Sequence, residues 1–460
     1  MIEYKIGFLP LYLKLYDDLF PEMREGMEAF SKTIQKELIK QGIKINPSSI
    51  CRTKEEFENA GKLFADCSAV VCLHLAYSPS LESVDMLESL NKPLIMLDTT
   101  MGESFGTEAT GEDLMNNHGI HGLQDLCSVL KRRKVKYFVE AGHWQTSNVM
   151  KRVSNLCKSA SASTSMRQGK VGLIGRSFDG MGDFAITPED LKQWIGTEVL
   201  HFDPDEISKI SCALTEKEVT KEIEEDTQNF EVASYDKEAH LRTVRMSLVL
   251  RKWIEENQLL GFSMNFADFK RELGFECVPF MEASKAMARG VGYAGEGDVL
   301  TAAFCGALLR IFPESSFTEI FCPDWKGRSL FLSHMGEMNP SIATGKMLMT
   351  AKEYVFSDVD SPMMAFGCFK PGVATLANLA QTEIGKFTLI LSEMEALEAE
   401  NVEHLSETIR GWIRPKQPVE RFLEQYSEEG GTHHQVLVYG DAMRTLKAFG
   451  EMMNFKIKVI

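Results

Sequence analysis

The stretch Gly292-Tyr-Ala-Gly-Glu-Gly-Asp298 runs directly into the apolar, alanine-rich segment Val299-Leu-Thr-Ala-Ala-Phe-Cys-Gly-Ala-Leu-Leu-Arg310. The apolar segment predicts a buried helix. Asp298 is suited to cap that helix, because its side chain can accept hydrogen bonds from the first backbone N–H groups. Glu296 stands between two glycines, which permit backbone angles closed to other residues and let another group come close. We therefore expect Glu296 on a tight loop, as a metal ligand, a general base, or simply an exposed residue of an ordinary helix-entry loop.

Upstream of this stretch, residues 1–165 alternate short apolar runs with amphipathic helices. The expected strands are Lys5–Leu9, Ile43–Ile45, Ser68–Leu75, Pro93–Leu97 and Lys134–Val139, and the expected helices are Glu22–Gln41, Ser80–Leu90 and about Ser147–Lys158. Such alternation is typical of a parallel sheet with helices on both faces. It predicts an N-terminal, doubly wound, Rossmann-like α/β domain. The small-residue segment Ser159–Ser165 is the linker candidate at its end, with a surface turn inside one domain as the alternative.

Residues 166–312 are predicted to form a central α/β domain that carries Glu296. The segment opens with a strand, Lys170–Ile174, and a glycine-containing loop, Phe178–Phe184, whose spacing differs from the G-x-G-x-x-G pattern of dinucleotide-binding loops. Three helices are expected after this loop. They are an acidic, exposed helix without chemistry at Thr215–Thr227 and amphipathic helices at Arg242–Gln258 and Phe280–Arg289.

The character of the chain changes after residue 312, and residues 313–460 are predicted to form a mostly antiparallel β domain. Short strand-like runs appear, separated by turn residues at short spacing, a pattern that favours an antiparallel sheet or barrel. These runs are Phe317–Phe321, Ser329–Ser333, Glu353–Phe356, Met363–Phe369, Phe387–Ser392, Gln435–Tyr439 and Lys456–Ile460.

Three segments of the C-terminal domain offer partners for Glu296. Glu319 shares a strand face with Phe317 and Phe321, where a carboxylate is costly unless it is paired or binds a metal. His334 follows the end of the next expected strand, and His433 and His434 precede a strong one. Two glutamates and two histidines form a mixed oxygen and nitrogen set that suits Mn²⁺, Co²⁺ or Mg²⁺ better than a structural Zn²⁺ site, which would normally use cysteine. The alternative is that these are ordinary core or surface residues.

Composition excludes several classes of partner. The chain has 460 residues, with 50 Lys and Arg against 66 Asp and Glu, and its net charge of −16 disfavours nucleic acid and anionic membranes. The ten cysteines form no C-x-x-C pair and are typical of a reduced, cytosolic protein. The first residues do not resemble a signal peptide, and no apolar run reaches the ~20 residues of a membrane span. We expect a cytoplasmic protein.

Several motifs, taken together and in order, resemble the L-arabinose isomerase family, part of the wider L-fucose/L-arabinose isomerase group. The specific motifs lie in the second half of the chain, and the resemblance covers most of the sequence. They are the opening stretch, Ser315-Ser-Phe-Thr-Glu319, Leu332-Ser-His-Met335 with Asn339-Pro-Ser-Ile-Ala343, Phe369-Lys-Pro-Gly-Val373, Gly430-Gly-Thr-His-His434, Ala442-Met-Arg444 and Ile457-Lys-Val-Ile460. Less specific ones are Leu73-His-Leu-Ala-Tyr-Ser-Pro79, Leu90-Asn-Lys-Pro-Leu94 and Asp113-Leu-Met-Asn-Asn-His-Gly-Ile-His-Gly122.

The resemblance implies a metal-dependent aldose–ketose isomerase that works through an enediol. Carried across by motif, the ligands of a divalent cation, Mn²⁺ first, fall on Glu296, Glu319, His334 and His434, and the two glutamates also correspond to the acid/base pair. Substrate contacts fall on His121, on His118 in place of the family's usual glutamine, and on His433. The family assembles as trimers stacked into hexamers with sites shared between subunits, so a homo-oligomer is expected.

One departure from the family leaves several candidates for the sugar substrate. Phe8-Leu-Pro-Leu-Tyr12 replaces the family's glutamine- and histidine-containing loop after the first strand. The substrate could be L-arabinose, a hexose, a deoxy sugar or an acid-substituted sugar such as a sulfonated one. An alternative of another class is a sugar-binding or regulatory homologue without catalysis, although all four ligand positions are filled.

Overall fold

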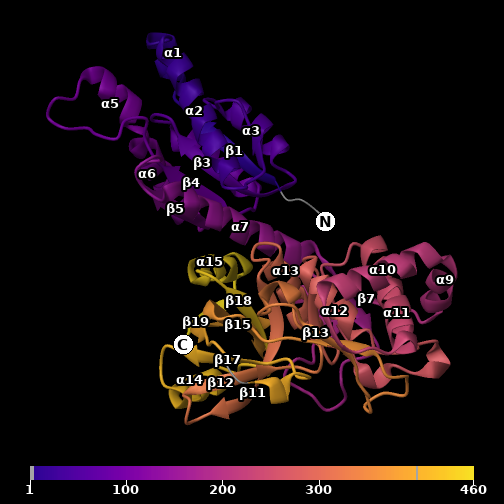
Figure 1. Ribbon diagram of the computed structural model, residues 1–460. Coiled ribbons are helices and arrows are strands. Elements are labelled where there is room, and N and C mark those ends of the chain that lie inside the picture. Colours follow the sequence, from indigo (N-terminus) through magenta and orange to yellow (C-terminus); the bar gives the residue numbers. More distant parts are fainter. Residues whose placement is uncertain (1–4, 400–401) are drawn as a thin grey trace. The chain divides into compact units, whose positions relative to one another are not determined.

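The apolar runs of the N-terminal region form a five-stranded parallel sheet in the computed structural model (Figure 1). The structure describes residues 5–399 and 402–460. The strand order is β2-β1-β3-β4-β5, one of the two common orders of doubly wound sheets. Its strands are β1 (Lys5–Leu11), β2 (Ile45–Pro47), β3 (Cys67–His74), β4 (Leu94–Asp98) and β5 (Tyr137–Ala141). All five expected strands are therefore present, with shifted ends. Residues 1–4, which entered the expectation of no signal peptide, lie outside the described residues.

Helices cover both faces of this sheet. One face packs on α3, α4 and α6 through an apolar core that includes Phe57, Val84 and Leu126. Since β3 is buried at all eight of its positions, the opposite face is covered as well. The helices of this region are α1 (Lys14–Leu19), α2 (Met23–Lys40), α3 (Lys54–Leu63), α4 (Ser80–Ser89), α5 (Gly111–Asn117), α6 (Gly119–Arg132) and α7 (Val149–Gln168).

The expected linker at Ser159–Ser165 is wrong as local structure, because this segment lies inside α7. The hydroxyls of Ser159, Ser161, Ser163 and Thr164 each donate to the backbone carbonyl four residues earlier, so small polar residues are accommodated within a helix. Contacts divide the chain into two units, Met1–Thr164 and Ser165–Ile460, and the division falls within this helix.

The second unit contains a four-stranded parallel sheet that leads to Glu296. Its order is β10-β9-β6-β7, with β6 (Lys170–Ile174), β7 (Glu198–His201), β9 (Gly261–Met264) and β10 (Gly292–Gly295). Helix α13 (Val299–Leu309) is buried at every residue, as its apolar sequence predicts. Asp298 caps it by accepting a hydrogen bond from the Thr301 N–H at 2.8 Å, also as predicted. The remaining helices before it are α8 (Pro188–Trp194), α9 (Asp205–Ala213), α10 (Glu216–Asn229), α11 (Lys237–Glu256) and α12 (Phe280–Ala288).

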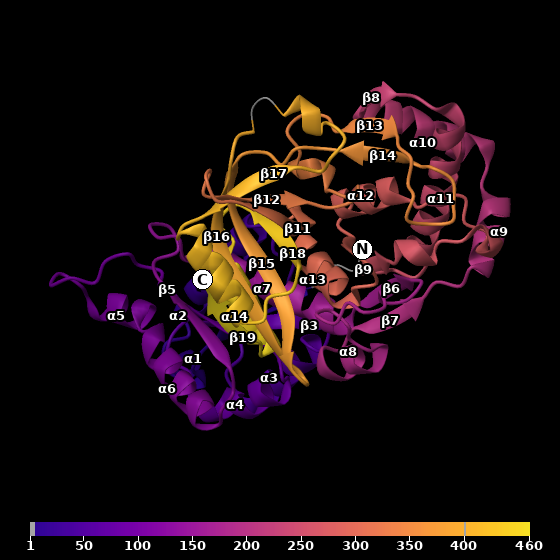
Figure 2. The ribbon, with the colours of Figure 1, turned by 90° about the horizontal axis from the view of Figure 1, so that it is seen from below.

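The C-terminal strands close into an antiparallel barrel. Six strands follow one another in the order β15-β18-β11-β12-β17-β16, and β16 pairs back onto β15, while β19 adds to β16 in parallel (Figure 2). They are β11 (Ser315–Asp324), β12 (Ser329–Ser333), β15 (Gly372–Glu383), β16 (Lys386–Ala396), β17 (Gly411–Pro415), β18 (His434–Tyr439) and β19 (Lys456–Val459). Helices α14 (Val419–Glu428) and α15 (Met443–Met453) complete this part. The antiparallel expectation for the C-terminal region thus agrees with the structure.

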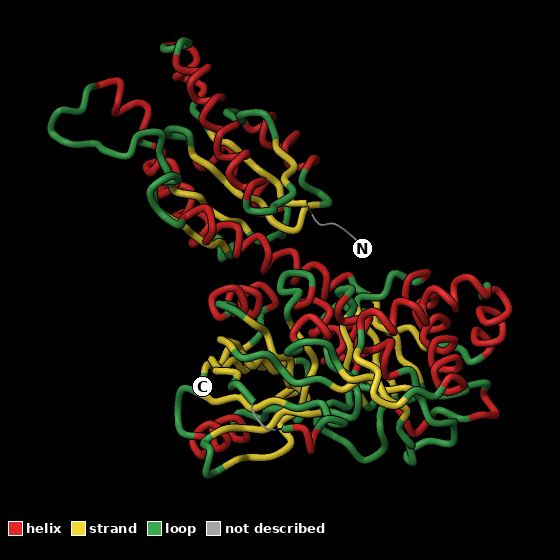
Figure 3. Tube along the Cα trace, viewed as in Figure 1, coloured by secondary structure: helices red, strands yellow, loops and turns green. Residues whose placement is uncertain are grey.

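A smaller sheet, β14-β13-β8, combines segments that are distant in the chain. It consists of β8 (Glu231–Ser234), β13 (Leu348–Ala351) and β14 (Met363–Phe366). The strand expected at Glu353–Phe356 is wrong, because these residues form loop and turn beyond β13 (Figure 3). From this loop the Tyr354 ring packs against that of Phe280. The apolar character of the segment therefore reflects a local contact of the loop and not the buried face of a strand.

Helix α10 also differs from its description as an exposed helix. Glu222 and Asp226, one turn apart on the same face, are buried against α11 and α12. Glu222 accepts hydrogen bonds from Arg251 and Lys285, and Asp226 accepts from Lys285. The acidic sequence of α10 suggested exposure, but part of its charge belongs to a buried ionic network with α11 and α12.

Two expectations from composition can be compared with the structure. All ten cysteines carry free thiols. Within the described parts of the chain, no helix has both the length and the apolar character needed to cross a membrane.

Candidate metal centre

Glu296 stands at the end of β10 in an unusual backbone conformation. Its φ of 55° lies in the left-handed region, which costs a residue with a side chain about 1–3 kcal/mol. The flanking residues are glycines at positions where a side chain would be too close to neighbouring atoms. A Cβ on Gly295 would lie 2.9 Å from Cε1 of His334, and one on Gly297 would lie 2.4 Å from the Arg176 carbonyl oxygen. The loop is thus pressed against its neighbours, and this aims the Glu296 side chain.

The barrel register brings the other acidic residue to the same place. Glu319 on β11 is directly opposite His434 on β18, on one side, and opposite Ser333 on β12, on the other. His334 is the residue after Ser333, so it leaves the end of β12 beside Glu319. Residues more than 100 positions apart in the chain therefore meet through strand pairing.

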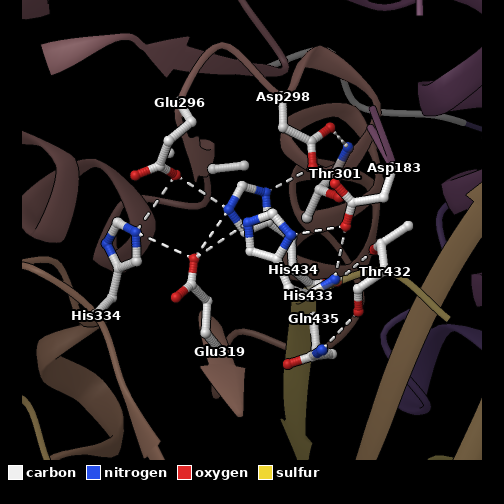
Figure 4. A network of polar contacts seen from close by, with 12 residues as sticks. Asp183, Glu296, Asp298, Thr301, Glu319, His334, Thr432, His433, His434 and Gln435 are labelled. Atoms are coloured by element: carbon white, nitrogen blue, oxygen red, sulfur yellow. Dashed lines mark hydrogen bonds and ion pairs between the residues drawn. The ribbon is translucent and has the colours of Figure 1, made fainter. Parts of the chain in front are cut away.

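Four side chains converge at this point (Figure 4). One ligand atom from each of Glu296, Glu319, His334 and His434 lies within 4.8 Å of all the others. His434 Nε2 is 3.0 Å from an oxygen of each glutamate, and His334 Nε2 is 3.5 Å from the same two oxygens. Both imidazoles and Glu296 are buried, and Glu319 is partly exposed.

A carboxylate accepts a hydrogen bond from each imidazole on the side of the ring opposite the cluster. His434 Nδ1 donates to Asp298 at 2.8 Å, and His334 Nδ1 donates to Glu337 at 2.7 Å. Glu337 in turn accepts from the Tyr293 hydroxyl at 2.5 Å and from the Gly336 N–H at 2.8 Å. Because the Nδ1 atoms are engaged, the Nε2 atoms point to the centre, an arrangement common for histidines that bind metals.

The charges around the centre also favour a cation. Burial alone would raise the pKa of Glu296, but His334 and His434 hold that pKa well below its usual range. Burial would lower the pKa of both histidines, but the surrounding carboxylates raise it strongly. Four carboxyl groups (Glu296, Asp298, Glu319, Glu337) thus surround two imidazoles, an excess of acidic groups that a divalent cation would balance. The donor set, its orientation and its charge fit such an ion.

Aromatic rings shape the space beside the four ligands. The edge of Phe317 meets His334 and His434, with centroid distances of 4.8 and 5.0 Å. Phe184 stacks on His434, with centroids 4.8 Å apart and planes within 8° of parallel. These contacts restrict the orientation of both imidazoles.

Comparison with known proteins places the chain in a family. Models of the N-terminal, central and C-terminal domains of L-arabinose isomerase match residues 17–168, 174–312 and 314–456. This chain belongs to the L-arabinose isomerase family. A protein named L-arabinose isomerase from Shouchella clausii is 24% identical to it, over 99% of this chain and 93% of the relative. A protein of the same name from Saccharophagus degradans is also 24% identical, over 100% of this chain and 94% of the relative. The relative from Halalkalibacterium halodurans is 26% identical over 81% of this chain and 77% of its own.

Solved structures add little to this assignment. A periplasmic solute-binding protein of an ABC transporter from Actinobacillus succinogenes, with bound D-allose, covers 67% of this chain and 92% of its own at 10% identity. Its TM-score is 0.17, too low for the likeness to carry an argument about fold or function.

The histidines expected to contact substrate lie in two places in this member of the L-arabinose isomerase family. His433 adjoins the four ligands, with Nε2 3.9 Å from Glu319. His118 and His121 belong to the N-terminal unit, where their rings lie 5.8 Å apart and His118 Nε2 is 2.9 Å from the Tyr16 hydroxyl. Substrate contact by all three stays a prediction.

Sequence reasoning missed three residues that surround the site in this family member. Glu337 stands three residues after His334, a spacing that could have marked it as a partner. Asp183 lies in the glycine-containing loop Phe178–Phe184, to which no role was assigned, and it accepts a hydrogen bond from His433 Nδ1 at 2.6 Å. Tyr293 is the second residue of the opening stretch, but its contact with Glu337 depends on a fold that its neighbours do not reveal.

Proposed function

We propose that this protein is a metal-dependent aldose–ketose isomerase that resembles L-arabinose isomerase in activity. The observation that carries the proposal is the cluster of Glu296, Glu319, His334 and His434, whose donor atoms lie within 4.8 Å of one another in a chain of that family. Mixed carboxylate and imidazole donors suit Mn²⁺, with Co²⁺ or Mg²⁺ as alternatives. The four residues would hold the cation together.

A bound divalent cation would polarise two adjacent sugar oxygens and stabilise the negative charge that develops on them during isomerisation. The chain's own residues carry out the proton movements. Isomerisation removes a proton from C2 of the aldose and returns one to C1, while a second proton moves between O2 and O1. Glu296 and Glu319 each have a carboxylate oxygen 3.0 Å from the His434 Nε2 atom, and this shared location supports their assignment to these transfers. His334 and His434 keep their Nε2 atoms on the centre through Glu337 and Asp298.

The two glutamates differ in their access to a ligand. Both histidines contact both glutamates, but the Glu319 side chain keeps 13% of its surface exposed, whereas that of Glu296 keeps 6%. Glu319 is therefore the more accessible of the two carboxylates to a sugar. We assign both to the acid/base pair.

The identity of the sugar is a matter for a substrate screen. Purified protein with added Mn²⁺ should convert at least one aldose of a panel of pentoses, hexoses, deoxy sugars and acid-substituted sugars to its ketose. Glu296→Gln keeps the size of the side chain but removes the base, so it should lower kcat at least about 100-fold. Near-normal activity of this variant would refute the assignment, and an inactive wild type without bound Mn²⁺ would favour a non-catalytic sugar-binding role.

The assembly and the location are also proposals from family membership. We propose a cytoplasmic homo-oligomer, a trimer or hexamer, in which His121 contributes to the site of a neighbouring subunit. Light scattering coupled to size exclusion should give three or six times the mass of the chain, and a fully active monomer would refute this part.

A further inference from the structure

The loop between β6 and α8 contacts two consecutive histidines, His433 and His434, at the start of β18. Asp183 Oδ2 accepts hydrogen bonds from His433 Nδ1 at 2.6 Å and from the His433 backbone N–H at 3.0 Å (Figure 4). The next residue, Phe184, stacks on His434. Asp183 and Phe184 thus contact the two histidines together, since the Phe184 ring also lies 5.4 Å from that of His433, although 250 positions separate Asp183 from His433 in the chain.

Asp183 decides which edge of the His433 ring faces the ligand cluster. A carboxylate only accepts hydrogen bonds, so the Nδ1 edge is turned toward Asp183 and occupied. Nε2, on the opposite edge, lies 3.9 Å from Glu319 Oε1. The His433 side chain is 40% exposed, in contrast to the buried His334 and His434, so it is the most accessible of the three imidazoles near Glu319.

We propose that Asp183 is a positioning residue, which holds His433 so that Nε2 makes a hydrogen bond with a hydroxyl group of the sugar next to Glu319. This inference rests on the proposed isomerase function, because it requires an open-chain polyhydroxylated substrate at the centre. Such a chain carries a hydroxyl on nearly every carbon, and an imidazole fixed on one side can select the hydroxyl that brings the reacting carbon to the carboxylate. His433 would touch the substrate, and Asp183 would act only through His433.

A double-mutant cycle tests this role. Asp183→Ala, His433→Gln and the double variant are compared with the wild type, using the sugar that the screen identifies. Asp183→Ala should raise KM about 5- to 30-fold, as expected for loss of one orienting hydrogen bond, with a smaller change in kcat. The double variant should be no worse than His433→Gln, because a residue that acts through another adds nothing once that residue is removed.

Further variants and a second readout separate positioning from folding. Asp183→Asn keeps an acceptor oxygen and should recover part of the loss in Asp183→Ala. Asp179→Asn alters an exposed carboxylate of the same loop, paired with Arg176, and should match the wild type. Mn²⁺ affinity, measured by calorimetry without sugar, should stay within about twofold in all Asp183 variants, since no ligand of the cluster is touched.

The possible results are distinguishable. Additive losses in the double variant, or Mn²⁺ affinity that falls in step with activity, would overturn the inference, because Asp183 would then act on the fold or on the ligands. An active wild type with an unchanged KM in Asp183→Ala would reject the inference alone. A wild type inactive on the whole panel would reject the proposed function, and the inference with it.

Discussion

Glu337 is the residue whose substitution most directly tests how His334 is held. It is buried and accepts hydrogen bonds from His334 Nδ1, the Tyr293 hydroxyl and the Gly336 N–H. Glu337→Gln keeps the size of the side chain but weakens the contact that turns Nε2 to the centre. We expect Mn²⁺ affinity to fall about 10- to 100-fold, as is typical when such a partner of a metal-binding histidine is altered. Calorimetric titration with Mn²⁺ measures it.

The matched control for that variant is Glu314→Gln. Glu314 precedes β11 and pairs with Lys370 at the surface, outside the cluster. Its substitution should leave Mn²⁺ affinity unchanged. Equal affinities for Glu337→Gln and the wild type would show that His334 does not need this partner.

At the scale of residues, the sequence was informative where a side chain stands at a recognisable chain position. Glu296 follows a glycine before a helix, Glu319 shares a strand face with aromatic residues, and His334 and His434 adjoin apolar strands, so the four could be selected as one cluster. Polar partners that lie far away in the chain could not be selected in the same way. The contacts of Asp183 with His433, and of Asp298 with His434, depend on the register between strands and loops more than 100 residues apart.

Helices α10, α11 and α12 are joined by a buried ionic network. We expect this network to contribute to the loss of folding stability of the second unit at acidic pH. Burial alone would raise the pKa of Glu222, but Arg251 and Lys285 hold this pKa at about 2, below its ordinary value of 4.5. The stabilisation is therefore fully present above about pH 4.5 and is lost as the pH falls toward 2. Glu222→Gln should destabilise the second unit by roughly 1–3 kcal/mol at pH 7, with a difference that shrinks below pH 4.5.

Calorimetric unfolding temperatures recorded from pH 7 to pH 3 measure this effect. Glu224→Gln, on the exposed face of the same helix, should change stability by less than about 0.5 kcal/mol at any pH. A difference between Glu222→Gln and the wild type that grows as the pH falls would contradict the assignment.

The elements that sequence patterns predict well are those with a single environment along their length. The apolar segment after Asp298 is a buried helix, and the N-terminal apolar runs are strands of a parallel sheet. Patterns failed where tertiary contacts overrode composition. The serine-rich end of α7 is helical, and its hydroxyls are accommodated by hydrogen bonds to the preceding turn. The apolar segment 353–356 lies in a loop, where Tyr354 packs against Phe280.

At the scale of the second unit, a bound cation would join the parallel sheet to the barrel. Its four ligands come from the end of β10, from β11, from the residue after β12 and from β18. Binding to the folded form alone should therefore raise the unfolding temperature, by the equivalent of about 2.7 kcal/mol at a Mn²⁺ concentration 100 times Kd. Differential scanning calorimetry with Mn²⁺ and with a chelator measures the change.

Glu296→Gln serves as the comparison in that experiment, because it removes one charged ligand and leaves the fold in place. It should reduce the Mn²⁺-dependent shift. An equal shift in both proteins would mean that Mn²⁺ binds elsewhere.

The organisation of the whole chain was predictable only in part. Alternating strands and helices indicated the N-terminal and central α/β regions, and short strands separated by turns indicated the antiparallel C-terminal region. The sequence left a sheet and a barrel as alternatives, because closure depends on the pairing of β15 with β16 and on long strands whose Ala and Thr residues do not stand out in the sequence.

Proton transfer by Glu296 and Glu319 is the central claim, and isotope exchange tests it most directly. Wild-type protein with Mn²⁺ and the aldose found by the screen is incubated in D₂O, and NMR follows deuterium at C1 of the ketose and C2 of the recovered aldose. We predict that the wild type forms ketose and incorporates deuterium at these carbons, and that Glu296→Gln and Glu319→Gln do neither at a comparable rate while remaining folded. Wild-type rates of ketose formation and deuterium incorporation in both variants would contradict the account.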